Sequence, residues 1–276
     1  MPIIEPFVRW AGGKTWFIST MQNLIRNVEI NHYHEPFLGG AAVFFSLDLN
    51  KKAYLSDVNE ELINTFLQIR DNPYEVIGVL SKFNNTEEDY YKIRSMVSEN
   101  KIEKAAQFIF LNQTSYNGIY RVNKNGVYNV PYGFRDNWNY DFSRIIRASS
   151  KLKNTQINCE DFETHKSRVQ PNDLVFLDPP YTVSHNNNGF IEYNKNLFSL
   201  DDQYRLSKYI DYIKKRGAYY ILTNAAHERI RQIFEKDDRI IEVSRNSLIG
   251  GKNAKREKIS ELIFTNLPED KNEFTN

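Results

Sequence analysis

The feature that most constrains the fold is an apolar run, residues 174–177 (Leu-Val-Phe-Leu), that leads directly into two consecutive prolines. Four consecutive apolar residues indicate a strand buried on both faces, as in a parallel sheet. Pro179 and Pro180 cannot continue such a strand, because they lack the N–H group that a central strand donates. The strand therefore ends at Asp178, close to the ring of Tyr181. Ligands of open α/β sheets bind at such strand ends.

Helical and strand-like segments alternate on both sides of this run, which indicates an α/β fold with a parallel, doubly wound sheet. Before the run, the sequence predicts a loop at Gly12-Gly13 followed by a helix, and two strand–helix units at residues 33–49 and 53–70. The remaining predicted strands cover 155–158, 218–222, 239–243 and 259–265, and further helices cover 201–216 and 226–236.

Residues 71–146 interrupt this alternation, and we interpret them as an inserted domain. Residues 74–111 have the spacing of amphipathic helices, whereas residues 112–140 contain seven aromatic residues, seven Asn and three Gly. Alternating side chains around Asn125-Gly126 predict a β-hairpin that turns there. The predicted division is a main domain of residues 1–70 and 147–268, the insert 71–146 and a polar tail 269–276.

Composition narrows the class of protein. The single cysteine, Cys159, excludes a disulfide framework and a cysteine-based zinc site, and we expect it to be a small buried strand residue. No apolar run approaches the roughly 18 residues of a membrane span, and the N-terminus lacks a signal-peptide pattern. We therefore expect a soluble, cytoplasmic protein. The 36 Lys and Arg residues nearly balance the 35 Asp and Glu residues, which leaves a net charge of +1.

The strand end at residues 178–181 has the chemistry to bind an exocyclic amino group. The Asp178 carboxylate and a backbone carbonyl can accept the two hydrogens of such a group, and Tyr181 offers a face on which its ring can stack. The same four residues are also compatible with an ordinary loop that starts with two prolines and carries a half-buried tyrosine. Other stretches of the chain are needed to decide between these interpretations.

Several separate stretches resemble the motifs of one known family, the Dam-like DNA adenine-N6 methyltransferases of the α type and D12 class. In that family the target-recognition segment is inserted between the cofactor half and the catalytic half. The resemblance covers nearly the whole chain, from Phe7 to about Asn266. The matching stretches are residues 7–14 (FVRWAGGK), 35–40 (EPFLGG), 56–60 (SDVNE), 116–121 (YNGIYR), 129–133 (NVPYG), 161–162 (DF) and 178–181 (DPPY).

The resemblance implies S-adenosyl-L-methionine as the cofactor, without a metal. At a strand end, the carboxylate of Asp57 can accept both ribose hydroxyls, although Asp57 could also cap the helix that follows. Gly39-Gly40 permits close approach of the backbone to the methionine moiety, but any tight strand–helix turn would use such glycines. The implied cofactor-binding residues are Trp10, Lys14, Glu35, Phe37, Gly39, Asp57, Asp161, Phe162 and Asp178.

The resemblance also implies double-stranded DNA as the partner and GATC as the target site. It places Arg121 and Arg9 on guanines, and Arg121 has the geometry to bond a guanine bidentately. It assigns Tyr116 to the gap in the base stack that the flipped adenine leaves. Ile119 and Pro131 are assigned to a thymine methyl group, and Asn123 and Asn129 to phosphates. Phe134 departs from family members that carry a basic residue there. Without the family match, residues 112–140 would be interpreted as an ordinary hairpin. The implied DNA-binding residues are Arg9, Tyr116, Asn117, Ile119, Arg121, Asn123, Asn129 and Pro131.

The implied reaction is direct in-line methylation of the N6 atom of a flipped adenine, with Tyr181 as a stacking face. Cys159 does not precede a proline, so a covalent route of the cytosine-C5 type is not expected. Two alternatives stay open: methylation of cytosine N4, which is the same kind of amino group, and a DNA-binding module without activity. We expect a monomer associated with the nucleoid that does not require a separate restriction endonuclease. The implied catalytic residues are Asp178, Pro179, Pro180 and Tyr181.

Two further segments are expected to contribute to DNA binding. Residues 244–258 contain five Lys or Arg residues and one Glu, which is typical of a flexible loop that meets phosphates, although such runs are usually only solvated. Residues 182–198 are predicted to form a flap over the flipped base. The near-zero net charge predicts weak non-specific affinity for DNA at physiological salt.

Overall fold

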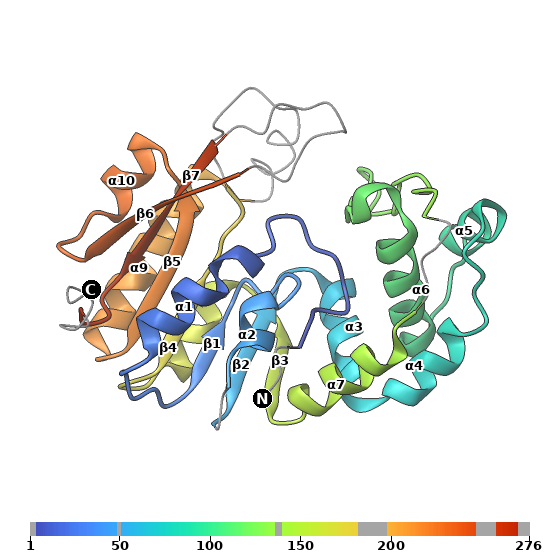
Figure 1. Cartoon of the computed structure of the whole chain (residues 1–276), viewed down its shortest axis with the longest axis horizontal. Helices are drawn as coiled ribbons and strands as arrows, with labels where there is room; N and C mark the ends of the chain where they lie inside the picture. Colours follow the sequence, from blue (N-terminus) through green and yellow to red (C-terminus); the bar gives the residue numbers. More distant parts are fainter. Residues whose placement is uncertain (1–3, 49–50, 136–139, 182–197, 247–257, 270–276) are drawn as a thin grey trace. The chain divides into compact units, whose positions relative to one another are not determined.

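A computed structural model of the chain contains two compact units, each built from segments that are far apart in the sequence (Figure 1). The first unit comprises Met1–Asn23 and Leu38–Glu160, and the second comprises Leu24–Phe37 and Asp161–Asn276. Residues 71–146, the predicted insert, belong to the first unit. The residues that the structure describes are 4–48, 51–135, 140–181, 198–246 and 258–269.

Helices dominate the first unit. The helices predicted within residues 60–70 and 74–111 are present as α3 to α6. The elements of this unit are η1 (Thr15–Phe17), α2 (Ala42–Ser46), β2 (Ala53–Asp57), α3 (Glu60–Asp71), α4 (Pro73–Leu80), α5 (Glu87–Arg94), α6 (Lys101–Thr114), η2 (Tyr116–Gly118), α7 (Phe142–Leu152) and β3 (Thr155–Cys159). Helix α1 (Ile18–Ile25) begins in this unit and ends in the second.

Helix α3 has both a cap and a continuous apolar face. The Asn59 side chain accepts a hydrogen bond of 3.0 Å from the Leu62 amide, and acidic residues occupy the first turn, where the helix dipole favours them. The helix contacts β2 and β3, which pair in parallel with Asp57 opposite Cys159. The buried apolar residues of α3 are Leu62, Ile63, Phe66 and Ile69.

The predicted hairpin is present, but as a tight turn with isolated bridges rather than a regular ladder. The Asn123 amide donates to the Val127 carbonyl at 2.8 Å, and the Asn123 side chain accepts from the Val127 amide at 3.0 Å. Gly126 adopts a φ of 76°, which a residue with a side chain rarely does. One antiparallel bridge joins Val122 to Tyr128. The turn therefore lies where Asn125-Gly126 predicted it.

The second unit contains the larger part of the sheet. Strands β1 (Tyr33–Glu35), β4 (Leu174–Leu177) and β5 (Tyr219–Ala225) are parallel, and β7 (Lys258–Thr265) pairs antiparallel with β5 and with β6 (Arg239–Asn246). Its strands are adjacent in the order β1-β4-β5-β7-β6. With β2 and β3, the described residues hold seven strands of a mixed α/β sheet, so the predicted α/β fold is confirmed. The described part of this unit has the helices η3 (Phe162–Arg168), α9 (Leu200–Lys215) and α10 (Glu228–Phe234).

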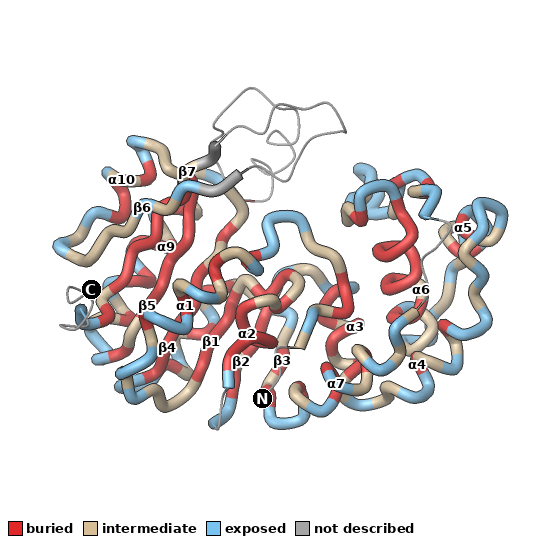
Figure 2. Tube along the Cα trace, viewed as in Figure 1, coloured by how far each residue is buried: buried red, intermediate tan, exposed pale blue. Residues whose placement is uncertain are grey.

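Strand β4 is buried along its whole length, as the four apolar residues predicted. Figure 2 shows β4 and β5 as buried traces within the second unit. Helix α9 covers β5 and begins with a capping box, in which Ser199 and Asp202 each bond the other's backbone amide. Side chains of β4, β5 and α9 share one buried apolar cluster.

Some local predictions need correction. The helix predicted for residues 41–49 is the short α2, which ends at Ser46. Cys159 is exposed, because it is the last residue of β3 rather than an interior one. Strand β6 extends to Asn246 and β7 starts at Lys258, so residues 244–258 are not one loop; residues 247–257 lie outside the described part. The predicted flap, residues 182–198, also lies outside it except for Phe198.

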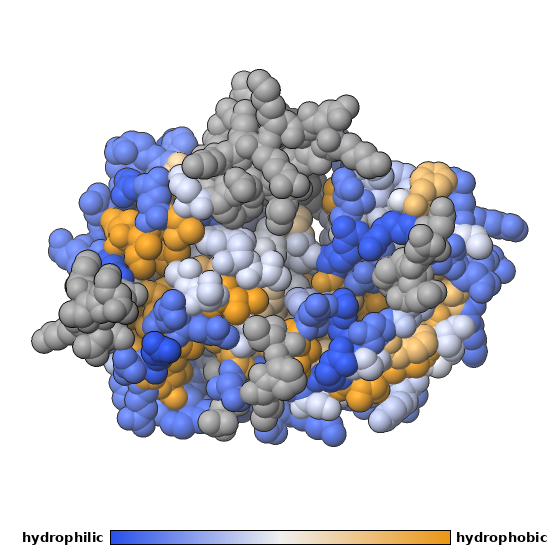
Figure 3. Space-filling model, viewed as in Figure 1, coloured by the Kyte–Doolittle hydropathy of each residue, from blue (hydrophilic) through white to orange (hydrophobic). Residues whose placement is uncertain are grey.

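The surface of the first unit is mostly polar on the face that Figure 3 shows. Hydrophilic residues predominate over the region of α5, whereas hydrophobic residues lie among hydrophilic ones over the region of α4 and α7. Among the helices of the described residues, none has the length and hydropathy that a membrane crossing requires.

Candidate active-site and DNA-reading residues

The predicted catalytic motif lies in the second unit, directly after β4. The half-buried Asp178 accepts a hydrogen bond of 2.8 Å at Oδ1 from the hydroxyl of Thr223 on β5. The Tyr181 hydroxyl donates to Oε2 of Glu261 on β7 at 2.5 Å. Thr223 and Glu261 are both fully buried. The carboxylate and the ring of the motif are therefore each held by a buried side chain of a neighbouring strand.

A second carboxylate lies in the same unit, at the end of β1. The Tyr33 hydroxyl donates to Oε2 of Glu35 at 2.8 Å, and both residues are buried. Burial raises the pKa of Tyr33 well above its ordinary value, and the charges of Glu35 and Asp178 raise it further. Both carboxylates thus act electrostatically on one phenol. Their negative field suits a ligand that carries positive charge.

Aromatic rings form a wall in the second unit. Phe37 stacks on Phe162 with ring centroids 5.3 Å apart, and Phe198 meets Phe37 edge-on at 5.6 Å. The guanidinium of Arg205 lies over Phe162 at 4.9 Å and donates to Asp161 at 2.8 Å. Phe37, Phe162 and Asp161, which the sequence predicted as cofactor residues, are therefore brought together.

The predicted ribose ligand, Asp57, lies in the first unit at the end of β2. Its Oδ2 accepts a hydrogen bond of 3.0 Å from the Gly39 amide, and its Oδ1 accepts one of 3.0 Å from the Asn59 amide. Burial raises the pKa of Asp57, whereas these amide bonds lower it. Asn59 caps α3, so the alternative of Asp57 as the helix cap is wrong. The carboxylate instead holds the glycine turn against the strand end.

The side chain of Trp10 packs against Gly39 and Gly40 and leaves no room for larger residues there. Gly39 has a φ of 46°, and a Cβ atom there would lie 2.7 Å from Cδ1 of Trp10. A Cβ atom on Gly40 would lie 3.1 Å from Cβ of Trp10. The Trp10 ring also stacks on Tyr120 of the hairpin, with centroids 5.7 Å apart. Trp10 therefore contacts both the glycine turn and the hairpin.

Lys14 is buried rather than on the surface. Its exposed fraction is 4%, and its Nζ atom donates to the Gly12 carbonyl at 3.0 Å. The positive charge thus lies within the loop 12–14, close to the segment that carries Trp10.

Arg9 is attached to the hairpin region through its backbone and its side chain. The buried Asn112 side chain accepts from the Arg9 amide and donates to the Arg9 carbonyl, both at 2.7 Å. A Cβ atom on Gly118 would lie 2.6 Å from Nε of Arg9, so the guanidinium lies directly on this glycine. Burial and the charge of Arg135 lower the pKa of Arg9. Among the described residues, Nη1 of Arg9 is buried and has no hydrogen-bond partner.

The other predicted DNA-binding residues lie on the surface of the hairpin region. Arg121 is exposed, and its Nε atom donates to Oδ1 of Asn129 at 2.8 Å. Asn129 therefore orients Arg121 in the free protein, and Asn123 stabilises the turn. Asn117 adopts a left-handed φ of 55°. The exposed residues of the set are Tyr116, Asn117, Arg121, Asn123, Asn129 and Pro131, and the half-buried ones are Arg9 and Ile119.

A comparison with known families settles what kind of protein carries these residues. The sequence model described as "D12 class N6 adenine-specific DNA methyltransferase" matches residues 10–249, which include the motifs of both units. The chain belongs to the D12 class of N6 adenine-specific DNA methyltransferases. This family uses S-adenosylmethionine, and its substrate is DNA, so the predicted enzyme class and cofactor are confirmed.

Individual relatives of this D12-class methyltransferase agree with the family match. It is 38% identical to the Type II methyltransferase M.MjaIII of Methanocaldococcus jannaschii over 80% of this chain and 84% of the relative. It is 33% identical to the Type II methyltransferase M1.LlaDCHI of Lactococcus lactis subsp. cremoris over 95% of both chains. A DNA adenine methylase of Vibrio cholerae is 27% identical over 93% of this chain and 94% of the relative.

Among the described residues, four whose side chains hydrogen-bond predicted site residues from distant parts of the chain were not foreseen from the sequence. Each makes its contact with a residue 44 to 103 positions away, so no local pattern indicates it. Such contacts follow only from the order of the strands and the packing of the helices. The four residues are Asn112, Arg205, Thr223 and Glu261.

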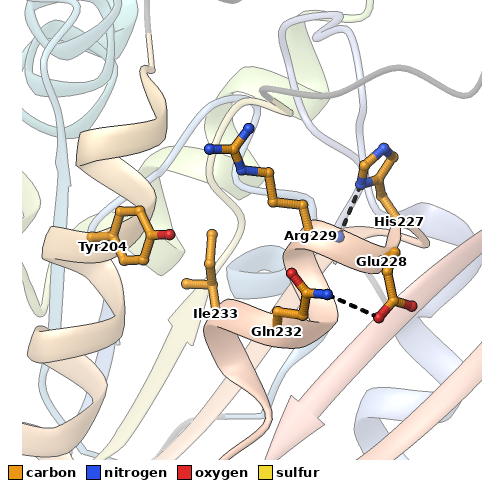
Figure 4. A pocket seen from close by; sticks show the side chains of 6 residues that line it. All are labelled: Tyr204, His227, Glu228, Arg229, Gln232 and Ile233. Atoms are coloured by element: carbon orange, nitrogen blue, oxygen red, sulfur yellow. Dashed lines mark hydrogen bonds between the residues drawn. The ribbon is translucent and has the colours of Figure 1, made fainter.

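A surface pocket of the methyltransferase lies beside α10 in the second unit (Figure 4). Within it, Nδ1 of His227 accepts from the Arg229 amide at 3.1 Å, and the Gln232 side chain donates to Glu228 at 3.2 Å. None of the predicted site residues lines this pocket. Its lining residues are Tyr204, His227, Glu228, Arg229, Gln232 and Ile233.

Proposed function

We propose that this methyltransferase acts on adenine N6 in duplex DNA at GATC, by base flipping and direct in-line transfer. When bound, S-adenosylmethionine supplies the methyl group. The observation that carries the proposal is the motif at residues 178–181, at the end of a fully buried strand, with its carboxylate held by Thr223. An exocyclic amino group needs acceptors at fixed positions, and the fixed carboxylate at this strand end supports that role.

The residues present fit the chemistry of the cofactor. The carboxylates of Glu35 and Asp178 suit a sulfonium and an amino group, and the rings of Phe37 and Phe162 suit an adenine. In the first unit, Gly39 leaves no room for a side chain beside Trp10, and Asp57 holds this turn. We infer that the cofactor is held by Trp10, Lys14, Glu35, Phe37, Gly39, Asp57, Asp161, Phe162 and Asp178.

Asp178 and the Pro179 carbonyl are proposed to accept hydrogen bonds from the adenine amino group. The lone pair of this nitrogen is delocalised into the ring in the ground state and becomes available as the nitrogen turns pyramidal. Acceptors placed for the pyramidal geometry stabilise the transition state more than the ground state, and this difference accelerates the reaction. The prolines fix the direction of the carbonyls because their φ angles are restricted.

Base flipping brings the adenine to this motif, since a base inside a duplex cannot reach it. We propose that Tyr181 stacks on the flipped base and that Tyr116, whose side chain is 55% exposed, fills the space left in the duplex. We propose that Arg121, whose Nε atom donates to Asn129, bonds one guanine. We propose that Arg9, whose buried Nη1 atom has no hydrogen-bond partner among the described residues, bonds the other. Ile119 and Pro131 contact the thymine methyl group.

On this proposal the enzyme works on cytoplasmic DNA at the nucleoid, as a monomer, and its activity does not require a separate restriction endonuclease. The test is incubation of the purified protein with a hemimethylated GATC duplex and with a duplex in which GATC is scrambled. We expect methylation of the first duplex alone, and its loss with Asp178→Ala. Near-normal turnover by Asp178→Ala would contradict the role of this carboxylate, and equal methylation of both duplexes would contradict GATC as the site.

A further inference from the structure

We propose that Thr223 and Glu261 are positioning residues for the methyl transfer. In this account, Thr223 fixes the rotation of the Asp178 carboxylate, and Glu261 fixes the plane of the Tyr181 ring. The inference rests on the proposed function, because it assigns Asp178 and Tyr181 to the reacting base. Neither Thr223 nor Glu261 belongs to a motif on which the family resemblance depends.

The register of the sheet places the two side chains on one face. In the antiparallel pair β5–β7, Thr223 is opposite Ile263 and Ala225 is opposite Glu261. Residues directly opposite each other share a face, and so do residues two apart on one strand. Thr223 and Glu261 therefore project from the same face of this pair of strands. Both reach residues of the 178–181 motif from there.

Thr223 can select one orientation of the Asp178 carboxylate. The last torsion of an aspartate is broad, so the carboxylate is not fixed by its own rotamer. The Thr223 hydroxyl donates to Oδ1 of Asp178 at 2.8 Å, and Thr223 is itself buried in a central strand with a stiff χ1 angle. An ionised carboxylate only accepts hydrogen bonds, so this donor also favours the ionised form of Asp178.

Glu261 plays the corresponding part for Tyr181. The Tyr181 ring follows two prolines, and its hydroxyl donates to Oε2 of the buried Glu261. Burying a carboxylate in a sheet costs free energy unless the carboxylate is hydrogen-bonded. Packing alone therefore does not explain a glutamate at position 261. The bond holds the hydroxyl end of the Tyr181 ring. It thereby sets the plane of the ring face on which the flipped base stacks.

The main test replaces Thr223 by Val, which has nearly the same shape but no hydroxyl, and by Ser, which keeps the hydroxyl. Single-turnover methyl transfer is measured at saturating DNA and cofactor, over a range of pH. We expect Thr223→Val to lower the rate at least tenfold and to move the acid limb of the pH–rate profile to higher pH. Thr223→Ser should restore the wild-type profile.

A matched control removes another buried threonine hydroxyl. Thr65 in the middle of α3 is buried and donates to the Glu61 carbonyl at 2.7 Å. Thr65→Val should leave the rate within about twofold of wild type. A Thr223→Val enzyme with the wild-type rate and pH profile would overturn the role of Thr223, as would equal losses in the Val and Ser variants.

The role of Glu261 is tested with Tyr181→Phe, which keeps the ring but removes the donor, and with Glu261→Leu, which removes the acceptor. We expect each variant to lower the rate at least fivefold on a fully paired duplex. The double variant should be no slower than either single one, because both remove the same bond. Additive losses, or a Tyr181→Phe variant with the wild-type rate, would overturn this part of the inference.

These outcomes are separable from failure of the proposed function. A wild-type protein that methylates no duplex would refute the proposed function. An active wild type that Asp178→Ala inactivates, while Thr223→Val behaves normally, would refute the positioning role alone.

Discussion

Single residues carry much of the geometry that the proposed reaction needs. Gly39 is an example, because its left-handed φ of 46° and the contact with Trp10 both exclude a side chain. The sequence alone identifies the glycine pair but gives only a general reason for it. The contact with Trp10, 29 positions earlier in the chain, is the particular reason that this turn requires glycine at position 39.

We predict that Gly39→Ala weakens binding of S-adenosylmethionine. A side chain at this φ costs about 1–3 kcal/mol, and the clash with Trp10 displaces a residue of the cofactor site. The expected loss of affinity is about tenfold or more by titration calorimetry. Gly78→Ala is the control, because a Cβ atom at Gly78 meets no atom within 4 Å. Unchanged affinity in Gly39→Ala would show that this turn does not contact the cofactor.

Arg121 is predicted to read one guanine. Arg121→Ala should lower discrimination at a single position of the site by about 1–3 kcal/mol, since a bidentate contact is lost there. Methylation rates on duplexes with each base at each position give this measurement. Asn129→Ala should have a smaller effect in the same direction, because Asn129 only orients Arg121. A uniform loss on all duplexes would make Arg121 a phosphate contact.

At the scale of elements, the sequence predicts best where one local pattern decides the structure. The apolar run of β4 and the spacing of α3 and α9 are of this kind. Prediction is poorer where an element ends, because ends depend on caps and neighbours; α2 stops at Ser46, and β6 continues to Asn246. Of the site, the motifs were predictable, but the supporting contacts of Asn112, Arg205, Thr223 and Glu261 depend on the packing of distant elements.

Strand β1 and the helix η3 each contribute one residue to a buried histidine pair, from which we expect stability to depend on pH. His34 and His165 are fully buried with ring centroids 5.8 Å apart, and Nε2 of His34 bonds Asp173 at 2.9 Å. Burial lowers the pKa of His165 to about 3, helped by the charges of His34 and Arg168. Burial also lowers the pKa of His34, although Asp173 counteracts this.

We predict that the free energy of unfolding falls as the pH decreases from 7 to 5. Above the unfolded-state pKa of about 6.5, His165 is neutral in both the folded and the unfolded chain, so it does not lower the free energy of unfolding. Below this pH, His165 binds a proton in the unfolded chain but not in the folded chain. This difference lowers the free energy of unfolding by about 2 kcal/mol at pH 5 for His165 alone. Urea unfolding at several pH values measures this, and His165→Gln should flatten the slope. An equal slope in this variant would assign the effect to other groups.

At the scale of the whole molecule, charge bears on DNA binding. The net charge of +1 is too small to hold a polyanion firmly, so non-specific binding is expected to be weak at physiological salt. Specific binding should then depend mainly on the hairpin residues. We predict a large ratio of specific to non-specific affinity, measured by fluorescence anisotropy on GATC and scrambled duplexes. Equal affinities would mean that phosphate contacts dominate.

Mass spectrometry of the modified nucleoside shows whether this chain methylates adenine N6 in DNA. Duplex DNA that contains GATC is incubated with the protein and S-adenosylmethionine, and the digested nucleosides are then identified. We expect N6-methyladenine and no N4-methylcytosine, with no product from Asp178→Ala. N4-methylcytosine, or DNA binding without any methylated nucleoside, would contradict it.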